Sequence, residues 1–232
     1  MNTVKTISLL VVCIIFCLLL GGCRAGMQAR NVDIKQSLLV NPAILEKGKG
    51  DQALYRYANP QADIKKYSKI MIDPVLVDKQ GELDAKEREN YQKLANNAYV
   101  YLHQELKQDY KIIQNPEPGT LRIQMAIMDA DSSKPVRNIT STIIPIGIGL
   151  SLVKYGATGK MSGVGEITGE FKATDAVTGE LLGAALDRRV GGKDIEGMVD
   201  RWHHADAALQ YWAKGVRYAL CKRREGTGCV KP

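Results

Sequence analysis

An apolar run close to the N-terminus separates the first residues of the chain from the part that can fold as a domain. Lys5 precedes the run, which extends from Ile7 to Leu20, and Gly21 and Gly22 come after it. A basic start, an apolar stretch and small residues before a cleavage point are typical of a secretory signal peptide. The run is also shorter than the roughly 20 residues that a membrane-spanning helix needs. We therefore expect residues 1–22 to be a signal peptide, and the fold to be built from the remaining residues.

Cys23 stands directly after the two glycines. The sequence Leu20-Gly21-Gly22-Cys23 resembles the lipobox of bacterial lipoproteins, in which the cysteine becomes the lipidated N-terminus after cleavage. The resemblance implies a lipid on Cys23, and two or more acyl chains would hold the protein at the membrane permanently. A plain N-terminal membrane anchor that contains a cysteine is the alternative. Arg24 is the next residue, and among Gram-negative lipoproteins the absence of Asp at this place implies the outer membrane, on its periplasmic side.

The rest of the chain has the composition of one globular domain on a tether. The whole chain has an apolar content of 45% and a charged content of 25%, which exclude a disordered protein. Residues 23–36 are polar and predict a lipidated tether, and 37–232 predict a single domain. The net charge of +7 is spread along the chain, which indicates a solvated surface. Because an exported protein meets little nucleic acid, we expect no nucleic-acid partner.

Two of the five cysteines lie in the predicted domain, because Cys13 and Cys17 belong to the signal peptide and Cys23 is the predicted lipidation site. In an oxidising compartment this count predicts a disulfide between Cys221 and Cys229. A redox-active pair is the alternative, but the spacing is not Cys-x-x-Cys.

Periodicity predicts two long helices. The first begins at Asp84, which forms a capping box with Glu87, and then repeats apolar residues at helical spacing as far as Leu106. The second runs from about Asp194 to Cys221. Its expected buried stripe consists of Ile195, Val199, Trp202, Leu209, Trp212, Ala213, Val216 and Leu220.

Alternating or apolar segments predict the strands. They cover residues 70–77, interrupted by Pro74, then 110–113, 121–128, and a hairpin of 166–174 with 182–187. We expect the segment before residue 60, which is rich in turn signals, to wrap the surface without a large element. The predicted fold class is α/β (α+β): one antiparallel or mixed sheet covered by two long helices.

Motifs with recognisable chemistry are weak. Asp200 and His204 lie four apart on the last helix and are weak candidates for a metal site, with no cluster to complete it. The glycine-rich residues 156–161 fail as a phosphate loop, because Met161 stands where magnesium binding needs Ser or Thr. We therefore predict no catalytic residues, no cofactor and no enzyme.

The segment 143–169 is the most unusual part of the domain. Large apolar residues alternate there with small ones, and glycines come after them. A lipid-facing barrel hairpin would alternate in this way, but its return arm does not alternate and Pro145 removes a donor. We expect an excursion from the sheet that offers an interaction surface. Its apolar residues are Ile144, Ile146, Ile148, Leu150 and Leu152.

Several stretches of the domain resemble bacterial envelope lipoproteins built on a domain of unknown function. The resembling stretches are 58–60, 66–75, 110–113, 116–123, 175–182, 187–189 and 202–213. The resemblance implies a lipid-anchored envelope protein and assigns it no reaction.

The sequence therefore predicts a binding or scaffold module with a membrane contact through its lipid and an envelope protein or glycan as partner. One alternative is an oligomeric pore or secretion lipoprotein, similar to the curli-secretion type, that uses residues 143–169. Another is an enzyme on envelope substrates, for which Asp129, Asp187 and Asp200 are the candidate acids.

Overall fold

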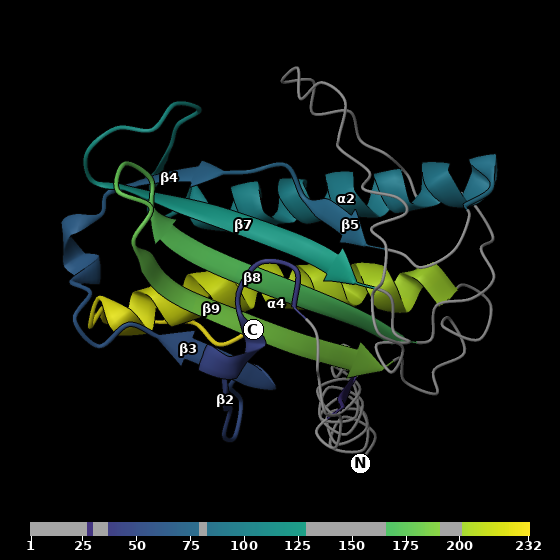
Figure 1. The fold of residues 1–232 in the computed structure, drawn as a ribbon, viewed down its shortest axis with the longest axis horizontal. Helices are drawn as coiled ribbons and strands as arrows, with labels where there is room; N and C mark the ends of the chain where they lie inside the picture. The colour runs from purple at the N-terminus through teal and green to yellow at the C-terminus, as the bar shows by residue number, and fades with distance from the viewer. Residues whose placement is uncertain (1–26, 30–36, 79–82, 129–165, 191–200) are drawn as a thin grey trace, which may run out of the picture.

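A computed structural model of the chain describes residues 27–29, 37–78, 83–128, 166–190 and 201–232. Within them the chain forms one open, mixed sheet of nine strands with two long helices (Figure 1). The strands are β1 (Met27–Gln28), β2 (Glu46–Lys47), β3 (Tyr55–Ala58), β4 (Lys69–Ile72), β5 (Leu76–Asp78), β6 (Lys111–Ile112), β7 (Thr120–Met128), β8 (Glu166–Asp175) and β9 (Leu181–Val190). The helices are α2 (Ala85–Leu106) and α4 (Arg201–Arg223), with short 3-10 turns at Pro42–Ile44 and Ile64–Lys66.

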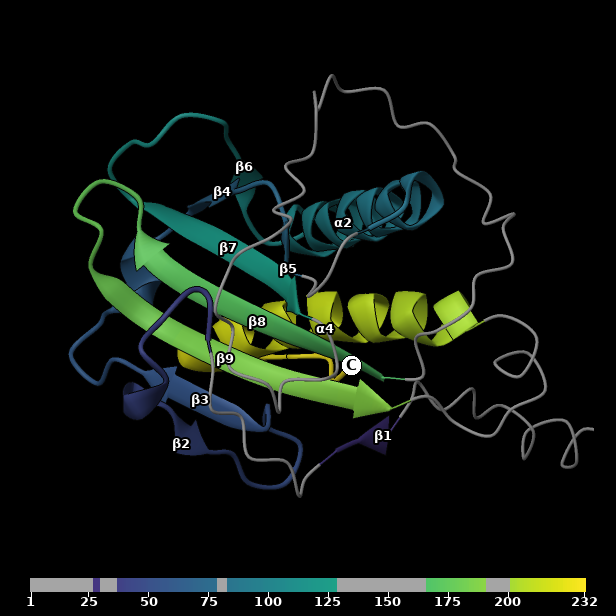
Figure 2. The ribbon, with the colours of Figure 1, turned by 45° about the vertical axis from the view of Figure 1, so that its right-hand side comes forward.

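The centre of the sheet is the antiparallel set β7, β8 and β9. Along the main path the strand order is β2-β3-β9-β8-β7-β4-β6; β5 also pairs with β7, and β1 with β9 (Figure 2). β4 and β5 are parallel to β7, and β4 is parallel to β6. The predicted mixed sheet is therefore confirmed. Pro74 divides the expected first strand into β4 and β5, because its nitrogen has no hydrogen to donate.

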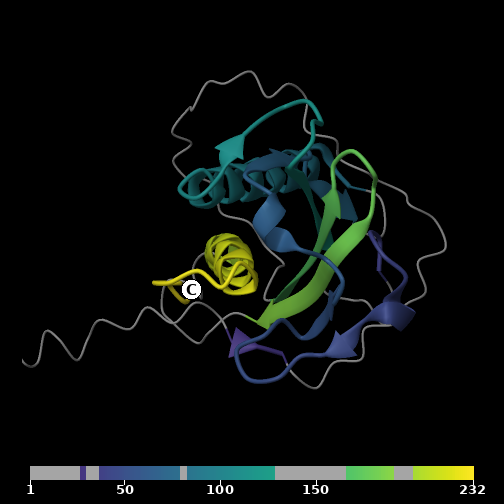
Figure 3. The same cartoon turned by 90° about the vertical axis from the view of Figure 1, so that its left-hand side faces the viewer.

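Both helices lie on one face of the sheet (Figure 3). Asp84 caps α2 and forms the predicted capping box with Glu87. The two helices are joined by Asp206 of α4, which accepts hydrogen bonds from Asn97 at 2.9 Å and Tyr101 at 2.8 Å. The helices pack on the sheet more loosely than predicted, since space remains between α4 and the strands beneath it. Among the described residues, neither helix is long and apolar enough to cross a membrane.

The core lies between the helices and the sheet. Its largest fully buried members include Tyr67, Leu102, Leu121 and Leu209. On the other face of the sheet lies Glu170, which is fully buried. Its carboxylate accepts hydrogen bonds from the backbone N–H groups of Leu38 and Leu39. This contact fastens the segment that includes Leu38 and Leu39 to the centre of the sheet.

Three strands go beyond the sequence-based predictions. β1, β2 and β3 are short, and their residues lack the alternation that a longer strand shows. β3 nevertheless pairs with β9 over four residues. β1 lies inside the segment 23–36 that the polar composition assigns to a tether, and it pairs Met27 with Val190. The signal peptide, most of the tether, residues 129–165 and the start of the last predicted helix lie outside the described residues. The predicted excursion 143–169 is wrong at its end, because residues 166–169 belong to β8 and pair with β7 and β9.

Candidate functional site

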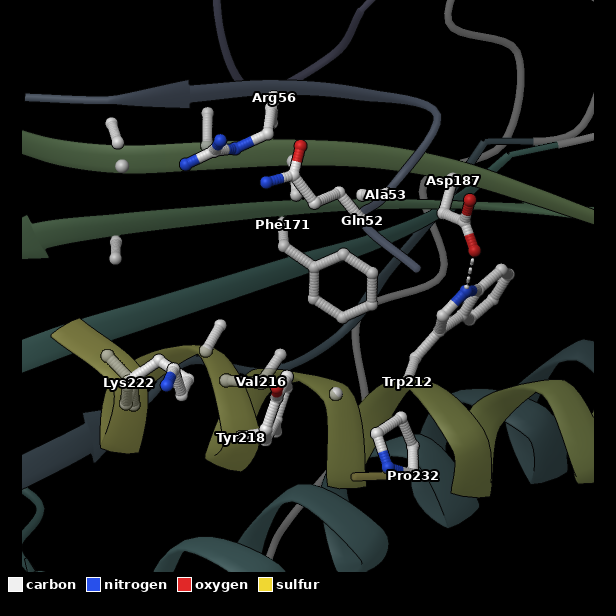
Figure 4. A pocket seen from close by; sticks show the side chains of 18 of the residues that line it. Gln52, Ala53, Arg56, Phe171, Asp187, Trp212, Val216, Tyr218, Lys222 and Pro232 are labelled. Atoms are coloured by element: carbon white, nitrogen blue, oxygen red, sulfur yellow. Dashed lines mark hydrogen bonds between the residues drawn. The ribbon is translucent and has the colours of Figure 1, made fainter. Parts of the chain in front are cut away.

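A pocket of about 680 Å³ lies between α4 and the part of the sheet that β3, β9 and β8 form (Figure 4). This volume is in the range of pockets that hold small molecules. The sheet register brings Arg56 of β3 opposite Ala185 of β9, and Ala185 opposite Phe171 of β8. Since residues paired across a sheet share one face, these three side chains point to the face that α4 covers.

Small residues keep the pocket open. The sheet side contributes Ala58, Ala173, Gly183 and Ala185. On the helix side stands Gly215, where an added Cβ would meet no atom within 4 Å. Glycine inside a helix costs roughly 1 kcal/mol relative to alanine. Since no neighbour excludes a side chain at Gly215, the missing side chain leaves open space beside the helix.

Aromatic side chains close one end of the pocket. Phe171 and Trp212 meet edge to face, with ring centroids 5.9 Å apart. The Trp212 indole lies against Gly169, at which a Cβ would come within 2.7 Å of the ring. The indole N–H donates to Asp187 at 2.7 Å, which fixes the ring plane (Figure 4). This end of the pocket is therefore aromatic, with the Trp212 ring held in place by Asp187.

Asp187 is occupied by structural hydrogen bonds. Besides Trp212, its buried carboxylate accepts from the backbone N–H of Leu54 at 3.1 Å and from the side chain of Gln28. Arg189 approaches it at 3.9 Å. With its oxygens engaged in this way, Asp187 joins β1, the start of β3 and α4 at the wall of the pocket.

Basic side chains gather at the other end of the pocket. Arg56, Lys222 and Arg223 all line it. Arg223 donates to the backbone oxygens of Leu182 at 2.8 Å and Asn59 at 3.0 Å, which are neutral acceptors. Burial, and then the charge of Arg56, lower the pKa of the Arg223 guanidinium from its ordinary value. This end of the pocket is therefore rich in positive charge.

Residues 229–232 return along α4 to the pocket. The predicted disulfide between Cys221 and Cys229 is present in the structure and turns the chain back after the helix. Lys231 then pairs with Asp51 at 2.6 Å, and Lys231 and Pro232 both line the pocket. The disulfide thus holds the C-terminal residues in the wall of the pocket.

Most other predicted site residues lie outside the described residues. These are Cys23 and its lipobox, Asp200, the acids other than Asp187, and the apolar residues 144–152. The lipidation and the interaction surface stay predictions. His204 begins the described side chains of α4, and the described part of the chain contains no group of three His, Cys, Asp or Glu side chains that could hold a metal.

The family of the chain follows from its sequence match. Residues 35–216 match the model of a family described as "Protein of unknown function (DUF3313)". The chain belongs to this family. The predicted membership of a family built on a domain of unknown function is thereby confirmed, and the match assigns no activity.

Solved structures give weaker likenesses. A PelC dodecamer from Paraburkholderia phytofirmans is 11% identical, with a TM-score of 0.34, over 74% of this chain and 95% of that one. A DUF4136 family protein from Bacteroides thetaiotaomicron is 14% identical, with a TM-score of 0.36, over 73% and 98%. Likenesses this low carry no inference about assembly or ligand. No curated protein matches the DUF3313 chain.

The sequence alone does not predict this pocket. Helical periodicity places Trp212 in the buried stripe of the last helix, and Trp212 is indeed buried. Gly215, in the middle of that helix, is the one local signal available, because a glycine there lowers helix stability. Nothing in the sequence around Arg56 indicates that it lines a pocket, since its short strand shows no alternation of apolar and polar residues.

Proposed function

We propose that this DUF3313 protein is a lipid-anchored binding module of the bacterial envelope, and that its ligand site is the pocket beneath α4. Cys23 would carry the lipid and hold the protein on the periplasmic side of the outer membrane. The lipobox-like sequence before Cys23 supports the anchor. The pocket supports the binding role, because it combines an aromatic end with a basic end.

The open space at Gly215 carries the proposal. A helix packed on a sheet buries more apolar surface when its side chains fill the interface. Here the helix instead places glycine in a pocket that Gly183 and Ala185 also line, and about 680 Å³ stays open. Such a site lowers stability, and occupancy by a ligand would return the lost contacts.

The test uses N-phenylnaphthylamine, an uncharged dye that fluoresces in apolar sites. The full chain is reconstituted in nanodiscs of zwitterionic lipid, and empty nanodiscs supply the baseline. We expect saturable binding to the wild type and at least a tenfold loss in Gly215→Leu, whose side chain would take up part of the open space beside α4. Lys214→Leu adds the same side chain at the neighbouring exposed position and should bind as the wild type does. Equal binding by all three proteins would contradict the proposal.

The anchor is tested separately. Intact mass and membrane fractionation compare the native protein with Cys23→Ala. We expect the variant to lose both a lipid-sized mass and its membrane association. A variant that stays in the membrane fraction would show that Cys23 is not the anchor, and would favour the alternative in which residues 143–169 contact the membrane.

A further inference from the structure

We infer that the pocket selects small anions with an apolar body, and that Arg56 binds the carboxylate, phosphate or sulfonate group of such a ligand. The inference rests on the proposed function, because the pocket must bind a ligand before it can discriminate among ligands. It adds the chemical class of the ligand and the residue that recognises its charge.

Arg56 has donors available for a ligand. Its side chain is half-buried on the pocket face of β3 and forms no hydrogen bond or ion pair with any described residue. Glu46 stands opposite it in the pairing of β2 with β3, but the two charged groups do not form an ion pair. An anion that enters the pocket therefore gains a partner whose N–H groups are free to donate.

The two acidic side chains that line the pocket are already engaged. Asp51 is paired with Lys231 at 2.6 Å. Asp187 accepts from Trp212, at 2.7 Å, and from Leu54. Neither carboxylate therefore neutralises Arg56.

A like charge stands beside Arg56. Arg223 donates to two backbone oxygens, which carry no net charge. The guanidinium of Arg56 contributes to the lowered pKa of Arg223, so the two cations repel each other across the pocket. A bound anion would relieve this repulsion, and the planar fork of an arginine suits a carboxylate or phosphate particularly well.

The apolar wall of the pocket calls for a ligand with an apolar body. Phe171, Trp212 and Val216 line the part of the pocket between the sheet and α4 (Figure 4). Ala185 of β9 also lines the pocket, on its strand side. A fully hydrated anion such as inorganic phosphate would leave these side chains uncovered. An aromatic or aliphatic body would cover them and place its charged group at Arg56.

The pocket also lies close in sequence to the proposed lipid anchor. Gln28 lines the pocket and comes five residues after Cys23. Five residues span at most about 18 Å. A lipid on Cys23 would therefore keep this edge of the pocket close to the membrane surface, where amphiphilic anions are concentrated.

The experiment measures displacement of N-phenylnaphthylamine from the full chain in zwitterionic nanodiscs. The competitors are naphthalenesulfonate and naphthalenesulfonamide, which share one ring system and differ in charge. A charge-assisted hydrogen bond to Arg56 predicts that the sulfonate displaces the dye at about tenfold lower concentration. In Arg56→Gln most of the difference between the two competitors should disappear, with only the contribution of Lys222 and Arg223 left, while Lys86→Gln, which removes one exposed charge outside the pocket, should keep the full difference. Lysophosphatidic acid, a lipid anion, is titrated in parallel. If it displaces the dye at a lower concentration than the sulfonate does, the natural ligand is a lipid anion; the reverse order indicates a soluble anion.

Equal displacement by the two competitors in the wild type would overturn the inference, as would an unchanged ratio in Arg56→Gln. Dye binding that still responds to Gly215→Leu would then leave the proposed function standing. If Gly215→Leu binds the dye as tightly as the wild type does, both the proposed function and this inference would be contradicted. If Arg56→Gln fails to bind the dye at all, the wild-type comparison of the two competitors decides the question alone.

Discussion

At the scale of single residues, two buried carboxylates hold the sheet to the segments around it. Glu170 binds the backbone of Leu38 and Leu39 on one face. Asp187 joins Leu54 and Trp212 on the other. Each carboxylate satisfies backbone or indole donors that would otherwise be buried without partners. Both therefore connect segments that are distant in the sequence.

Asp187→Ala should lower the free energy of unfolding by about 3 kcal/mol, because the N–H groups of Trp212 and Leu54 would lose their acceptor. The free energy of unfolding of Asp187→Asn should lie between those of the wild type and Asp187→Ala, since the amide oxygen of asparagine can still accept one hydrogen bond. Urea unfolding followed by tryptophan fluorescence measures the change. As a control, Asp51→Ala removes an exposed ion pair near the same pocket and should leave the unfolding midpoint nearly unchanged. Equal effects at Asp187 and Asp51 would disprove the structural role of Asp187.

Asp175 provides a test by pH. Its carboxylate accepts from the backbone of Thr178 and Val177, each at 2.9 Å, and from the hydroxyl of Tyr67 at 2.9 Å. The Thr178 N–H is the largest cause that holds the pKa of Asp175 below its ordinary value of 3.8. A carboxyl with a lowered folded pKa stabilises the protein above its unfolded pKa, and that contribution is lost as the pH falls through the folded pKa.

Asp175→Asn should therefore be less stable than the wild type by about 1 kcal/mol at pH 7, because a neutral amide accepts more weakly than a carboxylate. The difference should shrink once the pH falls below about 4, where the carboxyl of the unfolded wild type, and then that of the folded protein, becomes protonated. Urea unfolding of both proteins from neutral to acidic pH measures this. A difference that stays constant over the whole range would show that the charge of Asp175 does not contribute.

At the scale of elements, α4 combines tight contacts on either side with an open middle. Trp212 packs against Gly169, and Arg223 binds the backbone of Leu182 and Asn59. Gly215 lies between these two attachments and lines the pocket. The helix is thus attached to the sheet at two points, and the proposed ligand site lies between them.

Gly215→Ala should raise the free energy of unfolding by up to about 1 kcal/mol, because alanine favours the helix and its methyl group meets no atom within 4 Å. Ala219→Gly, one turn later in the same helix and also at the pocket, should lower it by a similar amount. Thermal or urea unfolding measures both. A loss of stability in Gly215→Ala would mean that the site has no room for a side chain, and the pocket would then be smaller than the structure indicates.

The elements that local sequence specifies can be predicted. The capping box at Asp84 and the strands β7, β8 and β9 need only neighbours in the chain, and the structure confirms them. The expected half-burial holds for most of β9, but residues 125–128 of β7 and 167–171 of β8 are buried on both faces, because segments from elsewhere in the chain cover the sheet. β1 and β3 cannot be predicted in this way, because they become strands by pairing with distant segments: β1 with β9, and β3 with both β9 and β2. The pocket is hidden for the same reason: Arg56 and Gly215 lie far apart in sequence, and only the fold brings them together.

At the scale of the whole molecule, β1, which follows the proposed anchor in sequence, lies at one end of the long strands. β1 pairs with the last residues of β9, Arg189 and Val190. The turn between β8 and β9, which contains the exposed Val177, lies at the opposite end of these strands (Figure 1). A strand of ten residues is about 33 Å long. A lipid on Cys23 would therefore hold the β1 end close to the membrane and leave the turn free to stand away from it.

A fluorophore attached at Gln52→Cys, whose backbone oxygen accepts a hydrogen bond from Gln28 of β1, should be quenched strongly by lipids that carry a spin label on the headgroup. The same fluorophore at Val177→Cys should be quenched much less. The measurement uses the lipidated full chain in vesicles, and Cys23→Ala with each label supplies the baseline. Equal quenching at both positions would contradict the proposed orientation of the domain.

A crystal structure with bound naphthalenesulfonate tests most directly whether the space beneath α4 is a ligand site that recognises an anion through Arg56. We predict electron density for the ring between Trp212 and Ala185, with the sulfonate within hydrogen-bond distance of Arg56. A pocket that is filled by rearranged side chains, or a sulfonate that binds away from Arg56, would contradict this claim.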